Sequence, residues 1–255
     1  MKPVLIIAAV NQEIKKLELA LRNVSHVTAP AFTTAMGTLG SLPVVICAAG
    51  VGKINAAAAA ATLIERHQPK LVISTGCAGA YPGNGLAVGD LAVANVEILG
   101  DEGAITSHGW LGLQELGLPS ITKGSQHYYN EIPLSRHAAE KAMQLADYLG
   151  VNLTRGRFVT VSTCSGSLLQ GEELMRRCSA ITENMEGAAV ALVCLRYGVD
   201  CLEIRGISNL VEERDRENWN IPLAVEAAQR FVLKYLEDGV RSEPPPRQPH
   251  TEPKR

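Results

Sequence analysis

Four polar side chains that adjoin apolar segments are the first candidates for chemistry in this sequence: Glu13, Glu186, Arg205 and Asn209. A carboxylate at the end of a strand can serve as a general base on a nucleophile. A guanidinium inside an apolar segment stays charged and requires a carboxylate or an anion as its partner. A carboxamide both donates and accepts hydrogen bonds, whereas an ionised carboxylate only accepts. The amide at position 209 is therefore expected to decide which ring the protein binds.

Each charged residue of this set also has a structural explanation that needs no ligand. Glu13 and Glu186 each begin a predicted helix, where a carboxylate is stabilised by roughly 0.3–1 kcal/mol. The helix after Glu186 is apolar all round, so this carboxylate is expected to be partly buried and to need a partner. Arg205 could supply that partner, because a structural ion pair with Glu186 or with Glu13 would satisfy both charges.

Apolar segments of strand length alternate with segments of helical spacing along most of the chain. The predicted strands cover residues 2–10, 32–38, 42–49, 71–75, 89–98, 158–162, 180–182 and 201–207. The predicted helices cover residues 13–22, 54–66, 135–149, 167–178, 186–197 and 222–237. This alternation predicts an α/β fold in which helices cover a mostly parallel sheet.

In such a sheet, binding sites form at the carboxyl ends of the strands. The rule selects six segments of this chain, namely residues 11–13, 50–53, 76–79, 163–166, 184–186 and 208–209. Residues 50–53, Gly-Val-Gly-Lys, lack the first glycine and the Ser or Thr of a phosphate-binding P-loop. They form either a tight strand-to-helix turn or a contact near a ribose or a water. Residues 99–131 show no clear periodicity and predict a long, partly ordered loop, which is often a functional segment.

Composition excludes several classes of protein. The chain has 255 residues, of which 46% are hydrophobic and only 4% aromatic, and its net charge of −2 argues against a nucleic-acid partner. The six cysteines form no CxxC or Cys/His spacing, so we expect neither a structural metal nor disulfides. No run is suited to be a signal peptide or a membrane span. We expect a cytoplasmic protein with one domain over residues 1–239 and a disordered tail over residues 240–255.

Taken together, the motifs resemble those of the purine nucleoside phosphorylase/nucleosidase family. The resemblance covers about residues 1–237 and rests on six motifs in the family's order: residues 6–13 (IIAAVNQE), 50–57 (GVGKINAA), 75–79 (TGCAG), 89–90 (GD), 184–189 (NMEGAA) and 204–209 (IRGISN). It implies a three-layer α/β/α sandwich with a mixed, mostly parallel central sheet. It also implies a small-molecule nucleoside as substrate, no metal or organic cofactor, and a homodimer or a larger homo-oligomer.

The resemblance further implies a role for individual residues of these motifs. Glu13 matches the carboxylate that activates the attacking water, and Arg205 and Cys77 match the residues that place this water. Glu186 matches the residue that binds the ribose hydroxyls, and Asn209 matches the position that faces N7 of the leaving base. The other implied substrate contacts are Ala78, Gly79, Thr163, Cys164, Met185 and Ser208.

The sequence departs from the adenine-specific nucleosidases of the family at position 209. Those enzymes end the last motif in Ser-Asp, and the Asp protonates N7, whereas this chain ends it in Ser208-Asn209. An amide is a poor acid but can pair with N7 and a 6-oxo group, so the departure predicts a 6-oxopurine and rejection of the other base pattern. No Arg or Lys lies in residues 11–14, and the Glu13 carboxylate repels phosphate, so hydrolysis is favoured over phosphorolysis.

The charged segment after Asn209 and residues 101–103 resemble one branch of the family, whose members release hypoxanthine from a nucleoside with a bulky aryl-carboxylate tail. The loop over residues 99–131 would then hold this tail, with Lys123 and His108 as candidate contacts for its carboxylate. Three alternatives stay open: a nucleosidase of methylthioadenosine and S-adenosylhomocysteine, a purine nucleoside phosphorylase, and a nucleoside-binding protein without activity. The intact Glu13 and Glu186 argue against the last of these.

Overall fold

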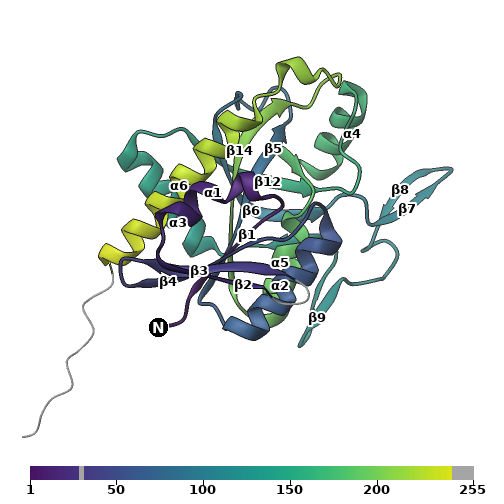
Figure 1. The fold of residues 1–255 in the computed structure, drawn as a ribbon. Helices are drawn as coiled ribbons and strands as arrows, with labels where there is room; N and C mark the ends of the chain where they lie inside the picture. Colours follow the sequence, from purple (N-terminus) through teal and green to yellow (C-terminus); the bar gives the residue numbers. More distant parts are fainter. Residues whose placement is uncertain (29–31, 243–255) are drawn as a thin grey trace, which may run out of the picture.

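A ten-stranded sheet runs through the centre of the computed structural model, which describes residues 1–28 and 32–242 (Figure 1). Its strands are β1 (Val4–Ala8), β2 (Arg22–Thr28), β3 (Thr33–Leu39), β4 (Leu42–Ala48), β5 (Leu71–Ala80), β6 (Leu91–Leu99), β11 (Glu131–Pro133), β12 (Leu153–Thr160), β13 (Thr182–Asn184) and β14 (Asp200–Leu210). Two small hairpins lie outside this sheet, namely β7 (Gly103–Thr106) with β8 (Gly109–Gly112) and β9 (Ile121–Lys123) with β10 (Gln126–Tyr128).

Two groups of parallel strands make up the sheet. One group contains β4, β1, β5 and β14, and the other contains β6, β12 and β13. Antiparallel pairings of β13 with β5 and of β14 with β6 join the two groups. Further antiparallel pairings add β11 to β6 and β3 and β2 to β4. The sheet is therefore mixed, as predicted, and the carboxyl ends of β1, β5 and β14 meet at one edge.

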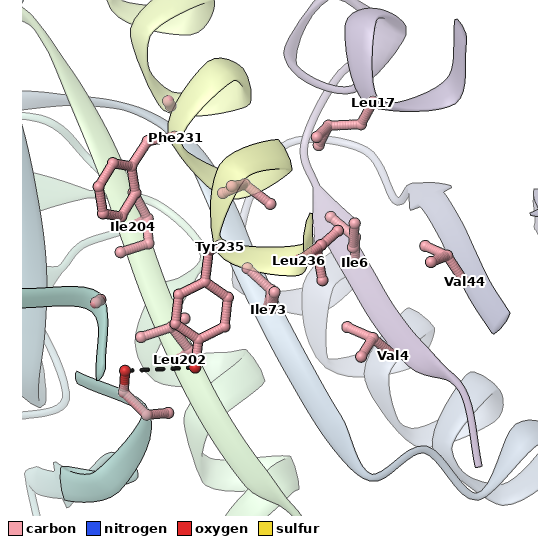
Figure 2. Close-up of a cluster of buried hydrophobic side chains, with 14 of the residues drawn as sticks. Val4, Ile6, Leu17, Val44, Ile73, Leu202, Ile204, Phe231, Tyr235 and Leu236 are labelled. Atoms are coloured by element: carbon pink, nitrogen blue, oxygen red, sulfur yellow. Dashed lines mark hydrogen bonds between the residues drawn. The ribbon is translucent and has the colours of Figure 1, made fainter. Parts of the chain in front are cut away.

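Helices cover both faces of the sheet and form the predicted three-layer sandwich. They are α1 (Lys15–Ala20), α2 (Lys53–His67), α3 (Arg136–Leu149), α4 (Leu168–Cys178), α5 (Gly187–Tyr197) and α6 (Ile221–Ser242). Val4 and Ile6 of β1 pack with α1, α3 and α6 on one face (Figure 2), whereas Leu5 and Ile7 pack with α2 and α5 on the other. Because both faces of β1 are buried, its sequence is a continuous apolar run without alternation.

The structure differs from the predicted elements in four places. No pattern predicts β2, because every residue of this strand is exposed. Helix α1 begins at Lys15, since residues 11–13 form a separate 3₁₀ turn. The segment predicted as a partly ordered loop, residues 99–131, contains both small hairpins. Helix α6 continues to Ser242, past its predicted end at residue 237 and into the predicted tail, and residues 243–255 of that tail lie outside the described residues.

Candidate active site

A cavity of about 350 Å³ lies at the carboxyl ends of β1, β5 and β14, beside β13. The strand-end rule predicts a site here, because the parallel pairing brings these ends together. Arg205 lies behind the cavity wall, and Thr163 is exposed and does not line the cavity. Nine of the predicted site residues do line it: Glu13, Cys77, Ala78, Gly79, Cys164, Met185, Glu186, Ser208 and Asn209.

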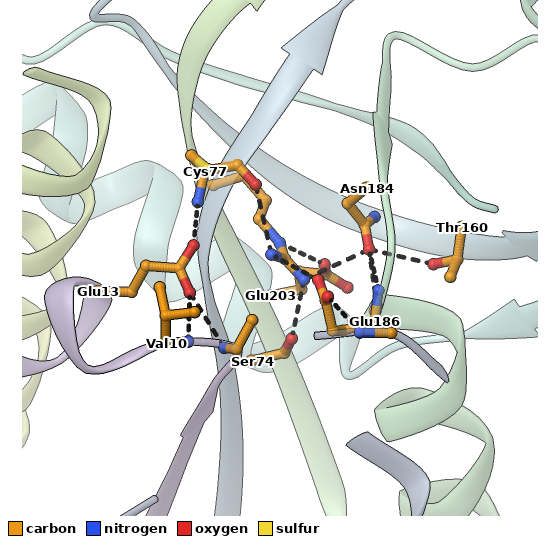
Figure 3. Close-up of polar contacts among 12 residues, drawn as sticks. Val10, Glu13, Ser74, Cys77, Thr160, Asn184, Glu186 and Glu203 are labelled. Atoms are coloured by element: carbon orange, nitrogen blue, oxygen red, sulfur yellow. Dashed lines mark hydrogen bonds and ion pairs between the residues drawn. The ribbon is translucent and has the colours of Figure 1, made fainter. Parts of the chain in front are cut away.

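Glu13 projects from the 3₁₀ turn after β1 and is only 5% exposed. Its Oε2 accepts hydrogen bonds from the backbone N–H groups of Ala9 (3.0 Å) and Val10 (3.1 Å), and its Oε1 accepts one from Cys77 (3.0 Å; Figure 3). Hydrogen bonds from backbone N–H groups stabilise the ionised form of a carboxylate. Since a carboxylate has about four acceptor positions, Glu13 can also accept a hydrogen bond from a water or a ligand in the cavity.

Glu186 precedes helix α5 and turns its carboxylate toward the glycine turn before α2. Its Oε1 accepts a hydrogen bond from the N–H of Gly52 (2.9 Å), and its Oε2 lies 3.6 Å from Nη1 of Arg205. Gly52 has a φ of 94°, a conformation that favours glycine. Burial raises the pKa of Glu186, while Arg205 and the Gly52 N–H act to lower it. The turn at residues 50–53 therefore does more than connect a strand to a helix. It also holds the Glu186 carboxylate, which lines the cavity.

Arg205 is buried within β14, with 1% of its surface exposed. Its Nε donates to Oε1 of Glu203 at 2.8 Å, and its Nη1 lies 3.4 Å from the carbonyl oxygen of Cys77. Burial acts to lower the pKa of Arg205, but the carboxylates of Glu203, Glu186 and Glu13 raise it above its ordinary value. The predicted ion pair with Glu186 is present. The closer partner is Glu203, which lies two residues earlier and therefore on the same face of the strand.

Gly76 is the position where Glu13 and Arg205 come together. A Cβ atom at this glycine would overlap Oε1 of Glu13 and would lie 3.0 Å from Nη1 of Arg205. Any side chain at position 76 would therefore displace one of these two groups. The carboxylate and the guanidinium share one small space beside this glycine, where a water could contact both of them.

A second pair of carboxyl groups, Glu97 of β6 and Glu203 of β14, lies behind the cavity, and both are 0% exposed. Glu97 accepts hydrogen bonds from Nδ2 of Asn184 (2.6 Å) and Oγ1 of Thr160 (2.8 Å). A Cβ atom at Gly187 would overlap oxygens of both carboxyl groups, which shows how closely they approach. Burial, and after it the neighbouring Glu203, raise the pKa of Glu97 well above its ordinary value. Burial and the neighbouring carboxyl group therefore favour the protonated form of Glu97.

Asn184 connects Glu97 to Glu186, which lines the cavity, and Figure 3 shows Asn184 beside Thr160 and Glu186. Its Oδ1 accepts hydrogen bonds from the backbone N–H groups of Glu186 (2.9 Å) and Gly187 (2.7 Å), and from Nη2 of Arg205 (3.3 Å). The side chain thereby satisfies N–H groups at the start of helix α5, which have no partner within the helix. Glu186, Arg205 and the Glu97–Glu203 pair are therefore parts of one hydrogen-bonded network.

Asn209 presents one amide N–H to the cavity. Its Oδ1 accepts a hydrogen bond from the hydroxyl of Ser208 (2.8 Å), and its Nδ2 donates to the carbonyl of Leu210 (3.0 Å). An amide nitrogen carries two hydrogens, so the second remains for a ligand. The amide at position 209 therefore lines the cavity and keeps one N–H with which it can donate to a ligand.

The two cavity cysteines are not activated thiols. Burial, and after it the carboxylate of Glu13, raise the pKa of Cys77 to about 12, and burial raises the pKa of Cys164 to about 11. Since the thiolate is the reactive form, both are poor nucleophiles at neutral pH. Within residues 1–28 and 32–242, no cluster of His, Cys, Asp and Glu could hold a metal ion, and no helix is long and apolar enough to cross a membrane.

Some cavity residues carry no prediction from the sequence. Arg214 and Trp219 line the cavity and contact each other, with the guanidinium 4.9 Å from the ring centre. They belong to the charged segment after Asn209, but its pattern gives no position relative to the sheet. The candidate tail contacts Lys123 and His108 do not line the cavity, and Lys123 Nζ donates to the carbonyl of Leu195 instead (2.8 Å). Glu183, Ile221 and Val225 also line the cavity without a prediction, whereas Ser165 and Asn184 line it from segments that the strand-end rule selects.

Comparison with known proteins places the chain in a family. Residues 3–237 match the family model described as the phosphorylase superfamily. A futalosine hydrolase of Thermus thermophilus is 36% identical over 197 residues, which are 77% of this chain and 83% of that protein. A 5′-methylthioadenosine/S-adenosylhomocysteine nucleosidase of a Shewanella species is 28% identical over 204 residues, which are 80% of this chain and 84% of that protein.

The fold has close counterparts among solved structures. The 5′-methylthioadenosine/S-adenosylhomocysteine nucleosidase of Neisseria meningitidis was solved in complex with methylthio-immucillin-A. It has a TM-score of 0.81 to this chain at 24% sequence identity. The match covers 93% of this chain and 100% of that chain. The chain therefore belongs to the phosphorylase superfamily, and both the predicted family and the predicted fold are confirmed.

Proposed function

We propose that this protein is an N-ribosyl hydrolase that cleaves futalosine into hypoxanthine and dehypoxanthine futalosine, a step of menaquinone biosynthesis. The observation that carries the proposal is that one cavity joins the Glu13 carboxylate to the Asn209 amide. The first group suits a water nucleophile, and the second suits a 6-oxopurine. The 36% identity to a futalosine hydrolase supports the choice of this nucleoside, and the sequence resemblance led to the same branch of the family.

In the proposed reaction, Glu13 accepts a proton from a water while the water oxygen bonds to C1′ of the ribose. The C1′–N9 bond breaks, and its electron pair leaves with the purine. Asn209 donates its free N–H to N7, where part of this charge collects, and the departing base then takes a proton from solvent. Glu186 accepts hydrogen bonds from the ribose hydroxyls, and Arg205 holds the Glu186 carboxylate in place. Cys77 contributes its backbone N–H, which orients Glu13.

Hydrolysis is favoured over phosphorolysis by the charge at the nucleophile's position. The carboxylates of Glu13 and Glu186 both lie near the guanidinium of Arg205 and interact with its charge. The positive charge of Arg205 is therefore already matched by carboxylates. A phosphate dianion beside Glu13 would meet like charge in a partly buried space. Water carries no such penalty.

A nucleosidase of methylthioadenosine or S-adenosylhomocysteine is the second candidate function. The 28% identity to such an enzyme and the shared fold favour it. This function requires adenine to bind and leave beside Asn209. In the adenine-specific nucleosidases that the sequence resembles, the residue matching position 209 is an Asp that protonates N7. An amide cannot donate a proton to N7 at neutral pH, so this candidate is the weaker one.

The two candidates separate in a comparison of substrates. We expect the purified protein to release hypoxanthine from futalosine and to release little adenine from methylthioadenosine. The Asn209→Asp variant should shift this preference toward the adenine nucleoside, because a carboxylic acid can protonate N7. Faster adenine release than hypoxanthine release by the wild-type protein would contradict the proposal.

We further propose a cytoplasmic, single-domain enzyme that forms a homodimer or a larger homo-oligomer. Ile54 at the start of α2 is 88% exposed, and the neighbouring Val51, 53% exposed, also lines the cavity. A second copy that covered these apolar side chains would bury them beside the site. Light scattering on the purified protein tests this, and a monomeric mass at micromolar concentration would contradict it.

A further inference from the structure

Two sequence motifs that the proposed reaction does not use meet at Lys53. This residue begins helix α2 directly after Gly52, and Asp101 and Glu102 follow strand β6. The Nζ of Lys53 donates to Oδ1 of Asp101 (2.5 Å) and to Oε1 of Glu102 (3.1 Å). Only 15% of the Lys53 side chain is exposed, so salt screens this contact less than one on the open surface. One ammonium group therefore joins two segments that lie far apart in the sequence.

Asp101 is held in place from a second direction. Its Oδ2 accepts a hydrogen bond from the backbone N–H of Ser162 (2.6 Å), which lies just after strand β12. Burial acts to raise the pKa of Asp101, but Lys53 and Ser162 lower it below its ordinary value. Burial acts to lower the pKa of Lys53, but Asp101 and Glu102 raise it above its ordinary value. Both shifts favour the charged forms, so Lys53 is anchored at the ends of β6 and β12 by an ion pair.

The residue before Lys53 binds a carboxylate of the cavity. The N–H of Gly52 donates to Oε1 of Glu186 at 2.9 Å. A Cβ atom at Gly52 would meet nothing within 4 Å, and the preceding Val51 is 53% exposed, so packing does little to hold this part of the turn. Within residues 1–28 and 32–242, Lys53 is the one residue of the turn 50–53 whose side chain is hydrogen-bonded to another segment. Its anchor therefore fixes the turn that presents the Gly52 N–H.

We propose that Lys53 is a positioning residue for Glu186, because its ion pair with Asp101 keeps the Gly52 N–H on the carboxylate that binds the ribose hydroxyls. The inference rests on the proposed function for this role of Glu186. Lys53 does not line the cavity, so it acts through Gly52 and not by contact with the substrate. The segment after β6 then supports ribose binding from outside the cavity, through Asp101 and Glu102.

The first test is the split between KM and kcat for hypoxanthine release from futalosine. Without the anchor in Lys53→Met, ribose binding weakens in the ground state and the transition state alike. We therefore expect KM to rise about 3–10-fold and kcat to stay within about threefold of wild type. Lys53→Arg keeps the charge and should hold KM within about twofold. The matched control Lys234→Met removes a surface ion pair with Glu237 and should change neither constant. An unchanged KM in Lys53→Met would overturn the inference.

A substrate without the ribose hydroxyls separates positioning of Glu186 from a general structural role. On the 2′,3′-dideoxy analogue of futalosine, Glu186 has no hydroxyl to bind, so Lys53→Met should raise KM by less than about twofold. A rise as large as that with futalosine would overturn the inference, because Lys53 would then act independently of Glu186.

A further measurement needs no substrate. Hydrogen exchange at the Gly52 amide, followed by NMR, reports directly on its hydrogen bond to Glu186. We expect exchange to be about 10-fold faster in Lys53→Met and in Asp101→Asn than in the wild-type protein, and unchanged in Lys234→Met. Equal rates in all four proteins would overturn the inference. If the wild-type protein released no hypoxanthine from futalosine, the proposed function would fail, and these exchange rates would still decide whether Lys53 positions Gly52.

Discussion

Glu13 and Glu97 are both buried carboxyl groups in one connected polar region, and they differ in what surrounds their oxygens. Glu13 receives three backbone N–H groups and faces a cavity. Glu97 faces a second carboxyl group, that of Glu203, with no exposure to solvent. Hydrogen-bond donors favour a negative charge, whereas burial and a second carboxyl group raise the pKa of Glu97.

The difference separates a chemical role from a supporting one. The Glu13 carboxylate lines the cavity and is oriented by three backbone N–H groups, which suits the chemical role that we propose for it. The Glu97–Glu203 pair reaches no substrate, but it holds Arg205 and Asn184, which in turn hold Glu186. Changes at Glu13 should therefore alter the rate most, and changes around the pair should alter folding first.

The largest expected effect is on the rate of Glu13→Gln. A Gln amide cannot accept the water's proton, and its N–H₂ would face backbone donors, so kcat should fall by about 10²–10⁴-fold. Hypoxanthine release from futalosine measures this. Glu18→Gln on helix α1 is the matched control, because Glu18 does not line the cavity. An unchanged kcat in Glu13→Gln would contradict the role of Glu13.

Removal of the Arg205 charge should cause the largest loss of stability. In Arg205→Gln the carboxylates of Glu203 and Glu186 lose their buried partner, which costs about 3–5 kcal/mol of unfolding free energy. Urea unfolding measures the change. Arg136→Gln removes a solvent-exposed partner of Glu140 and should leave the unfolding free energy nearly unchanged. Similar losses in the two variants would contradict the buried network.

Two glycines that lie in helices should respond oppositely to alanine. Gly187→Ala places a methyl group against the Glu97 and Glu203 carboxyls and should lower the unfolding free energy by about 1–3 kcal/mol. Gly239→Ala in α6 meets only Lys141 Nζ at 3.6 Å and should raise it by about 0.5–1 kcal/mol, the usual difference between the two residues in a helix. A stabilising Gly187→Ala would show that the carboxyl pair is not so close.

The smallest expected effect is a pH dependence of stability. Because burial and Glu203 raise the pKa of Glu97, the folded protein binds one more proton than the unfolded chain between the two pKa values. The stability from this proton is fully present below the unfolded pKa, about 4.3, and is lost as the pH rises through the folded pKa. Unfolding free energies of the wild-type protein should therefore fall above about pH 5 more steeply than those of Glu97→Gln. If the unfolding free energies of the two proteins changed with pH in parallel, the raised pKa of Glu97 in the folded protein would be contradicted.

The sequence predicts the polar side chains at and next to the cavity better than the hydrogen-bonded network behind them. Glu13, Glu186, Arg205 and Asn209 adjoin apolar strands or helices, and the strand-end rule brings such positions together. Their roles in the reaction stay predictions. The ion pair of Arg205 with Glu186 was one of two options that its charge allowed, and the structure shows it.

Other contacts depend on register, which a single sequence does not specify. Glu97 and Glu203 each interrupt an apolar strand, which is a visible signal, but the sequence does not show that their strands β6 and β14 pair with each other. The position of Glu183 could not be predicted for the same reason, because it lies beside Gly79 only through the pairing of β13 with β5. Thr163 and Cys164 are neighbours in sequence, yet only Cys164 lines the cavity.

The most direct test of the proposed function is the rate of hypoxanthine release from futalosine by the wild-type protein, with and without added phosphate. Because we propose that Glu13 activates water, we predict release in phosphate-free buffer at a rate that phosphate does not increase, with free dehypoxanthine futalosine as the second product. Release that requires phosphate and yields a sugar 1-phosphate would contradict the account.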